Sequence, residues 1–149
     1  QKRTYFQLCG NLFINEITNV TPTHAGITAA DKTHKDKTLY VVSEDGGGST
    51  FIKPTDQKII SEEKVVMTAI DHKQYNGRVK LIKLDIEGYE LDALKGAEMT
   101  IREFKPVILF ESNPGAEEQR NEIFMFLKKY DYEVGRIEQF ENMFIAVAD

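Results

Sequence analysis

The stretch from Lys80 to Ala97, KLIKLDIEGYELDALKGA, is the most informative part of the sequence about the fold. Its residues 81–84 form a short, mainly apolar run, which is typical of a strand buried on both faces of a parallel sheet. Apolar residues then recur at three- and four-residue spacing over 91–104, and this period predicts a helix that packs back onto the sheet. A second apolar run, PVILF at 106–110, follows directly. The sequence therefore predicts a β-α-β unit.

Carboxylates stand at the end of both predicted strands. Asp85 and Glu87 follow the first strand, and Glu111 ends the second. Ligands of open α/β sheets bind beyond the carboxyl ends of the strands, so these acids are candidates for contact with a substrate. Gly88 lets the chain turn sharply after the first strand, because glycine carries no Cβ. The alternative is that these acids are solvated residues of exposed turns.

Lys83 lies on the same face of the predicted strand as Asp85. A lysine on a buried strand requires a partner, and an ion pair with a neighbouring acid explains Lys83 better than a catalytic role does. The three histidines lie in separate segments without the spacing of metal ligands, and a single cysteine excludes a cysteine-based zinc site. Oxygen-rich Asp85, Glu87 and Glu111 would suit a hard cation such as magnesium, but we expect no bound metal.

The rest of the chain predicts further elements of one domain, and 149 residues are enough to bury a core. Periodic apolar residues predict two more helices, and short apolar runs predict six more strands. The helices are 4–17 and 116–130, and the strands are 20–28, 39–42, 51–52, 65–71, 132–137 and 143–147. Glycines in GGGS at 46–49 predict a flexible loop. The short polar segment 138–142 joins the last two strands, which are therefore predicted to be antiparallel.

Composition excludes several classes of protein. The net charge of -5 argues against a general nucleic-acid binder, because such proteins need a basic surface to displace counterions. No apolar run approaches the roughly 20 residues that cross a bilayer, so we expect no membrane-spanning segment. Cys9 is the single cysteine, which fits a reducing compartment, and we predict a cytoplasmic location.

Taken in order, the first strand, the DIEGYE turn, the LKGA helix and the PVILFE strand resemble the FkbM-type S-adenosylmethionine-dependent methyltransferases. Upstream, residues 11–20 and the segment 25–28 (AGIT) resemble the family's helix with spaced asparagines and the small-residue strand after it. Residues 47–49 resemble its glycine-serine loop, and residues 68–71 (TAID) its short Thr-x-Leu-Asp element. The resemblance runs the length of the chain and is most specific over 81–97.

The resemblance implies an α/β domain with a Rossmann-like class I methyltransferase fold, whose mostly parallel sheet ends in a C-terminal antiparallel hairpin. It implies S-adenosylmethionine as the cofactor and transfer of a methyl group to an oxygen of a small molecule or sugar. The residues implied are Asp85 and Glu87 for catalysis, Glu111 and Lys83 for substrate binding, and Gly26 and Thr28 near the adenine of the cofactor.

The chain departs from the family in one respect. Family members bind the cofactor mainly through a glycine-rich loop after the first strand, and an acid after the second strand binds the ribose; neither stretch is present. We therefore expect residues 1–149 to be a partial methyltransferase domain without its first two strands. The resulting gap would destabilise the chain, let its strands re-pair, or be filled by a partner, as in a homo-oligomer. The alternative is a non-catalytic remnant of the fold that acts as a binding or assembly module.

Overall fold

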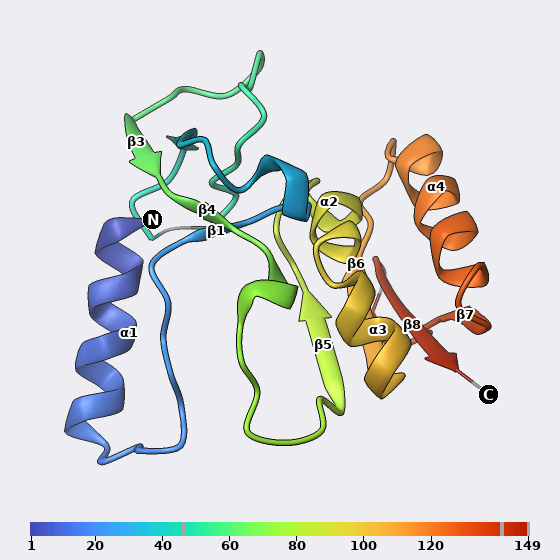
Figure 1. Ribbon diagram of the computed structural model, residues 1–149. Helices are drawn as coiled ribbons and strands as arrows, with labels where there is room; N and C mark the ends of the chain where they lie inside the picture. Colours follow the sequence, from blue (N-terminus) through green and yellow to red (C-terminus); the bar gives the residue numbers. More distant parts are fainter. Residues whose placement is uncertain (46, 141, 149) are drawn as a thin grey trace. The chain divides into compact units, whose positions relative to one another are not determined.

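The computed structural model of the chain describes residues 1–45, 47–140 and 142–148 (Figure 1). The chain divides into two compact units: unit 1 holds residues 1–26 and 34–67, and unit 2 holds residues 27–33 and 68–149. The predicted glycine loop at 46–49 and the predicted polar connection at 138–142 each contain one residue, Gly46 and Glu141, that lies outside the described residues.

Unit 1 contains one helix and an antiparallel pair of strands. Helix α1 spans Lys2–Ile14, and none of its residues is buried. It ends earlier than predicted, because the side chain of Asn15 donates a hydrogen bond to the carbonyl of Asn11 and Glu16 turns the backbone to a φ of 54°. Strand β2 (Lys37–Val41) pairs with β3 (Ser61–Val65). The predicted strand at 51–52 is replaced by an isolated bridge between Thr50 and Tyr40.

The strands predicted at 20–28 and 65–71 are shorter than expected. Strand β1 is Gly26–Ile27 and pairs with β4, Met67–Thr68. Their ladder includes bonds from the Gly26 amide to the Val66 carbonyl and from the Thr28 amide to the Thr68 carbonyl, both 2.9 Å. The prediction over 20–25 is wrong because this mostly exposed segment contains a proline, which cannot donate to a ladder.

Unit 2 is built on a four-stranded sheet in the order β5-β6-β8-β7. The strands are β5 (Leu81–Leu84), β6 (Val107–Glu111), β7 (Tyr132–Arg136) and β8 (Met143–Ala148). Strands β5 and β6 are parallel, whereas β8 is antiparallel to both β6 and β7. The predicted C-terminal antiparallel hairpin is confirmed. Since β8 is antiparallel to both of its neighbours, β5, β6 and β7 run in the same direction, and β8 alone among these four strands runs against them, as expected for a mostly parallel sheet with an antiparallel hairpin. The Rossmann-like class I arrangement stays a prediction.

Three helices cover one face of this sheet (Figure 1). They are α2 (Glu90–Lys95), α3 (Glu98–Phe104) and α4 (Glu117–Lys128). Their apolar stripes meet the inward side chains of the strands, and the fully buried core includes Leu94, Ile101, Ile108, Phe110, Ile123 and Leu127. None of the described helices combines the length and apolar composition that a bilayer crossing demands.

The single helix predicted over 91–104 is two helices, with a break at Gly96 and Ala97. The carbonyl of Thr28 lies against this break: a Cβ added to Gly96 would stand 2.1 Å from the Thr28 oxygen. Glycine at this position lets the segment 27–33 approach the break between the helices.

Among the described residues of unit 2, no helix covers the opposite face of the sheet. Burial alternates along β5, so that Ile82 and Leu84 point into the core while Leu81 is 54% exposed and Lys83 is exposed with it. Val147 of β8, 45% exposed, lies on this open face as well. The prediction that β5 is buried on both faces is therefore wrong. One face of β5 is packed, and the other is open.

Candidate functional site

Three carboxylates from two neighbouring strands converge at the carboxyl end of the sheet in unit 2. Asp85 follows β5 directly, Glu87 lies in the next turn, and Glu111 is the last residue of β6. Because β5 and β6 are parallel and in register, their carboxyl ends meet at one edge of the sheet. The three side chains each offer a carboxylate oxygen, and these oxygens all lie within 4.8 Å of one another. The structure thus brings together the three acids that the sequence singled out.

These acids differ in how tightly they hold a proton. The hydrogen bond from Lys83 lowers the pKa of Asp85. Partial burial raises the pKa of Glu87, and the negative charges of Asp85 and Glu90 raise it further. Partial burial also raises the pKa of Glu111, with Asp85 as the next cause. The site therefore holds one carboxylate kept ionised and two that take up a proton more readily, which is the division that acid–base chemistry uses.

Lys83 forms the ion pair that the sequence favoured. Its Nζ lies 2.9 Å from Oδ2 of Asp85, and the prediction of this pair is confirmed. The two side chains are 53% and 48% exposed, so the lysine is not a buried charge and the pair adds little to stability, about 0–1 kcal/mol. Its main effect is on the charge of Asp85. The role of Lys83 in substrate binding stays a prediction.

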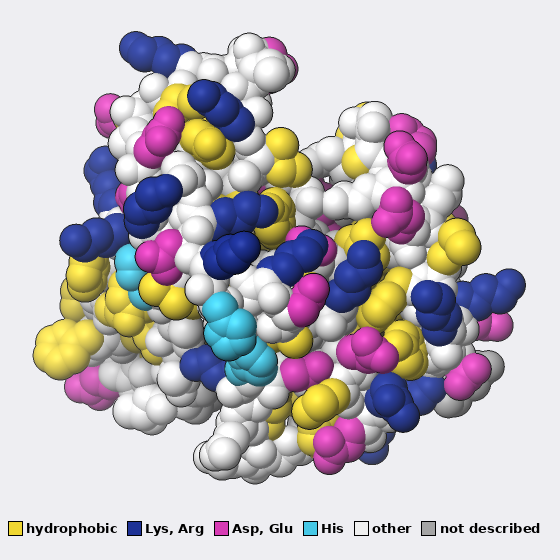
Figure 2. All heavy atoms as spheres, turned by 45° about the horizontal axis from the view of Figure 1, so that its top comes forward, with side chains coloured by type: hydrophobic (Ala, Val, Ile, Leu, Met, Phe, Trp, Pro, Cys, Tyr) yellow, Lys and Arg dark blue, Asp and Glu magenta, His cyan; other side chains and the backbone are white. Residues whose placement is uncertain are grey.

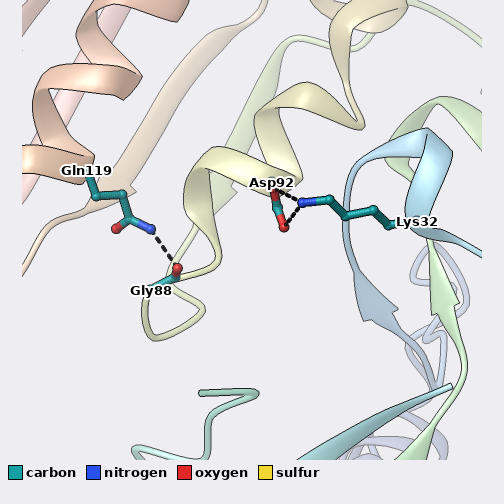
Figure 3. A network of polar contacts seen from close by, with 4 residues as sticks. All are labelled: Lys32, Gly88, Asp92 and Gln119. Atoms are coloured by element: carbon teal, nitrogen blue, oxygen red, sulfur yellow. Dashed lines mark hydrogen bonds and ion pairs between the residues drawn. The ribbon is translucent and has the colours of Figure 1, made fainter. Parts of the chain in front are cut away.

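The turn that carries Glu87 has a strained backbone, and side chains of Glu90 and Gln119 hydrogen-bond to it. Glu87 has a φ of 53°, a left-handed conformation that is uncommon for a residue other than glycine, and Gly88 follows with a φ of 92°. The carboxylate of Glu90, only 3% exposed, accepts the backbone N–H groups of Ile86 and Gly88 at 3.1 and 3.3 Å. From α4, Nε2 of Gln119 donates to the Gly88 carbonyl at 2.6 Å (Figure 3).

Glu90 and Gln119 are positioning residues that sequence reasoning missed. Glu90 looked like an ordinary acid in the first turn of a helix, where the helix dipole favours it. The sequence does contain an indication of this role, which is the spacing of Glu90 from Gly88. An acid two residues after a glycine can reach back and accept hydrogen bonds from the backbone amides of the turn. Gln119 gave no signal, since only the packing of α4 brings it to Gly88.

An ion pair connects α2 to the segment 27–33. Lys32 ends the short 3-10 helix η1 (Ala30–Lys32), and its Nζ donates to both carboxylate oxygens of Asp92 at 2.9 Å (Figure 3). Asp92 lies in the first turn of α2, directly after the acidic turn. This pair and the contact of Thr28 with Gly96 hold segment 27–33 against the helix that begins at the site.

The two residues predicted to lie near the cofactor make close contacts with protein. Thr28 is 2% exposed. Gly26 has no room for a side chain, because an added Cβ would stand 2.6 Å from Sδ of Met67 and from Cζ of Phe51. The close contacts at Gly26 explain why this position has no side chain. Contact of Gly26 and Thr28 with a cofactor stays a prediction.

Asp85, Glu87 and Glu111 are also the described residues that could hold a metal ion. Carboxylate oxygens are the ligands that Mg²⁺ and Ca²⁺ prefer, so a hard cation is the metal this group would suit. None of the described histidines belongs to such a group. The expectation of a metal-free site stays a prediction.

Comparison with known proteins gives one match. The family model described as the Methyltransferase FkbM domain matches residues 7–134, a range that includes all three converging acids. No curated protein and no solved structure matches the chain. The match confirms the resemblance noted in the DIEGYE turn and the strands around it, and it supports a methyltransferase activity in general. The chain belongs to the FkbM methyltransferase family.

Proposed function

We propose that this chain takes part in the transfer of a methyl group from S-adenosylmethionine to a hydroxyl oxygen of a small molecule or sugar. The observation that carries the proposal is the convergence of Asp85, Glu87 and Glu111 in a chain of this family. A hydroxyl is a poor nucleophile until a base accepts its proton, so O-methylation needs a carboxylate or a similar base beside the acceptor oxygen.

The pKa shifts suggest a role for each acid. Glu87 and Glu111 have raised pKa values, and a base works best when its pKa approaches the working pH. We assign the removal of the acceptor proton to one of these two glutamates. Asp85, kept ionised by Lys83, is placed to accept a hydrogen bond from the acceptor and so orient it. S-adenosylmethionine, when bound, supplies the electrophilic methyl group.

We also propose that a further polypeptide segment pairs with β5 and completes the cofactor site. Among the described residues, β5 pairs with β6 alone, so one of its edges is open, and Leu81 on the open face is 54% exposed. An open strand edge offers unpaired N–H and C=O groups to another strand. In a Rossmann-like class I fold, the strand at this place precedes the glycine-rich cofactor loop, which this chain lacks.

Unit 1, taken by itself, also has an uncovered apolar surface, on helix α1. This helix has no buried residue, and its Phe13 is 86% exposed. An amphipathic helix gains most of its stability from packing its apolar face, so an exposed apolar face indicates that a covering element is absent.

A second candidate function is a non-catalytic remnant that binds or assembles with another protein. The open edge of β5 is the observation that favours it. In that case the acids at the strand ends would be solvated side chains without a reaction to perform.

Methyl transfer can be measured on the longest polypeptide that contains this chain, as S-adenosylhomocysteine released from S-adenosylmethionine in the presence of hydroxylated small molecules and sugars. We expect Glu87→Gln or Glu111→Gln, whichever removes the base, to lower kcat about 10²-fold or more. Glu122→Gln makes the same chemical change on the exposed face of α4 and should leave kcat unchanged. Full activity in both site variants would contradict the assignment of the base.

The surface supports a small acceptor over a nucleic acid. Figure 2 shows both acidic and basic side chains on the displayed face. With a net charge of -5, this distribution does not provide the positive field that phosphate backbones require. The single cysteine supports the proposal of a reducing, cytoplasmic location.

A further inference from the structure

A pocket lies at the same end of the sheet as the acid cluster, on the side covered by α4. Its volume is about 400 Å³, which suits a small molecule, and its lining includes Ser112, Glu117, Arg120, Arg136, Asn142 and Phe144. Ser112 comes directly after Glu111, and its amide continues the ladder by bonding to the Asn142 carbonyl at 2.9 Å. Because side chains alternate along a strand, Ser112 points to the opposite face from Glu111. The pocket is therefore separate from the acid cluster but adjoins it.

Two arginines give the pocket its charge. Arg120 lies in α4 with a side chain only 23% exposed, and its guanidinium carbon is 5.6 Å from the centre of the Phe144 ring. Arg136 ends β7, which runs parallel to β6 and so brings this residue to the same edge of the sheet. Guanidinium groups present several N–H donors in a plane, a shape that matches the oxygens of carboxylates and phosphates.

One carboxylate also lines the pocket. Glu117 lies 3.7 Å from Arg120, is 59% exposed, and accepts the amide of Gly115 at 3.1 Å. Among the described residues, the lining thus includes two guanidinium groups and one carboxylate. The uncapped N-terminus of α4, which has no side-chain hydrogen bond at Ala116, adds a partial positive charge beside it.

Ser112 provides an independent sign of a ligand. Its side chain is 7% exposed, and its Oγ has no hydrogen-bond partner among the described residues. A buried hydroxyl without a partner is unfavourable and uncommon in folded proteins. A ligand oxygen in the pocket would give this hydroxyl an acceptor.

We propose that this pocket binds the phosphate or carboxylate group of a small acidic molecule. Arg120 and Arg136 contact the charged oxygens, and the Ser112 hydroxyl donates to one of them. Binding at this site does not require methyl transfer. A further step rests on the proposed function. If that function holds, the ligand is a methyl acceptor, and its acidic group binds in this pocket, next to the acid cluster, because Ser112 of the pocket directly follows Glu111 of the cluster.

The test is an NMR titration of the ¹⁵N-labelled protein with inorganic phosphate and, separately, with acetate, at an ionic strength held constant with sodium chloride. We expect saturable chemical-shift changes of the Ser112 and Asn142 amides and of the Arg120 side-chain N–H. The anion that binds more tightly, phosphate or acetate, identifies the acidic group that the pocket prefers. Absence of saturable shifts with both anions would overturn the proposal. Because this test detects binding alone, it remains decisive if no methyl transfer occurs.

Two variants separate binding from a structural role. Arg136→Gln should weaken binding of the preferred anion about tenfold or more, since it removes a charge-assisted contact, whereas Arg102→Gln on the exposed side of α3 should change it less than twofold. Ser112→Ala should weaken binding and at the same time raise the thermal midpoint, because it removes a buried hydroxyl that has no partner in the free protein. Equal loss of affinity in Arg136→Gln and Arg102→Gln would show non-specific attraction and contradict the pocket.

Discussion

At the residue scale, Gly96 lies where no side chain fits. A Cβ there would stand 2.1 Å from the carbonyl oxygen of Thr28, so Gly96→Ala must displace the break between α2 and α3. We expect a loss of about 1–3 kcal/mol in the free energy of unfolding. Gly10 lies inside α1 with nothing within 4 Å of an added Cβ, and Gly10→Ala should instead stabilise by about 0.5–1 kcal/mol. Chemical denaturation of both variants checks the opposite signs; the same sign for both would contradict the contact.

Glu90 is the residue that fixes the acidic turn. Glu90→Ala leaves the amides of Ile86 and Gly88 without their acceptor, and we expect a loss of about 1–3 kcal/mol in stability, measured by urea denaturation. Glu122→Ala, an equal truncation on the exposed face of α4, should change stability by no more than about 0.5 kcal/mol. If the two variants lose the same amount, Glu90 does not hold the turn.

The charge of Glu111 should reduce stability. Its raised pKa means that the folded chain binds the proton more tightly than the unfolded chain, so stability falls as pH rises from the ordinary glutamate pKa to the raised value. Glu111→Gln should therefore stabilise the fold above this window, by no more than about 1 kcal/mol because the group is near water. Urea denaturation below and above the window checks this. A gain of the same size at both pH values would exclude ionisation as the cause.

At the element scale, helix α3 receives its N-terminal cap from another part of unit 2. Asp71, in the 3-10 helix η2 (Ile70–His72), accepts the amides of Met99 and Thr100 at 2.8 and 2.9 Å and the Thr100 hydroxyl at 2.7 Å. Loss of a helix cap costs about 0.5–2 kcal/mol, and we expect this loss in Asp71→Ala.

Hydrogen exchange localises the effect of Asp71→Ala. The amides of Met99 and Thr100 should exchange faster in the variant, because they lose their acceptor. Asp31→Ala, which removes an exposed acid from η1, serves as the control and should leave these amides unchanged. Unchanged exchange in Asp71→Ala would show that the cap does not hold the helix.

The sequence predicted the elements that depend on local patterns. Strand β5, the turn at Gly88 and the closing hairpin follow from apolar periodicity, glycine and short connections, all of which act over a few residues. The break at Gly96 was not predictable, because it depends on the carbonyl of a residue far away in the sequence. The open face of β5 was missed for a similar reason, since Leu81 is apolar whether or not a helix covers it.

The site was predicted to the extent that it depends on strand direction. Parallel strands bring their carboxyl ends together, so acids after β5 and β6 were expected to meet, and the structure places their oxygens within 4.8 Å. The residues that hold the turn were missed, because the contact of Gln119 depends on how α4 packs. Local sequence thus indicated the charged groups of the site, but not the residues that hydrogen-bond to the turn and position them.

At the scale of the whole molecule, we propose that this chain carries the acids of a methyltransferase site whose cofactor loop comes from a further segment. The open edge of β5 and the lack of the family's glycine-rich cofactor loop support this proposal together. A segment that pairs with β5 would add its backbone to the sheet and bring its own loop to the edge where the acids lie.

Calorimetric titration with S-adenosylhomocysteine shows whether cofactor binding needs the further segment. It is made on the 149-residue chain and on the longest polypeptide, encoded by the same reading frame, that contains it. We expect binding by the longer polypeptide and none by the 149-residue chain alone. Absence of binding by both would contradict the claim and favour the non-catalytic remnant, and tight binding by the 149-residue chain alone would contradict the need for a further segment.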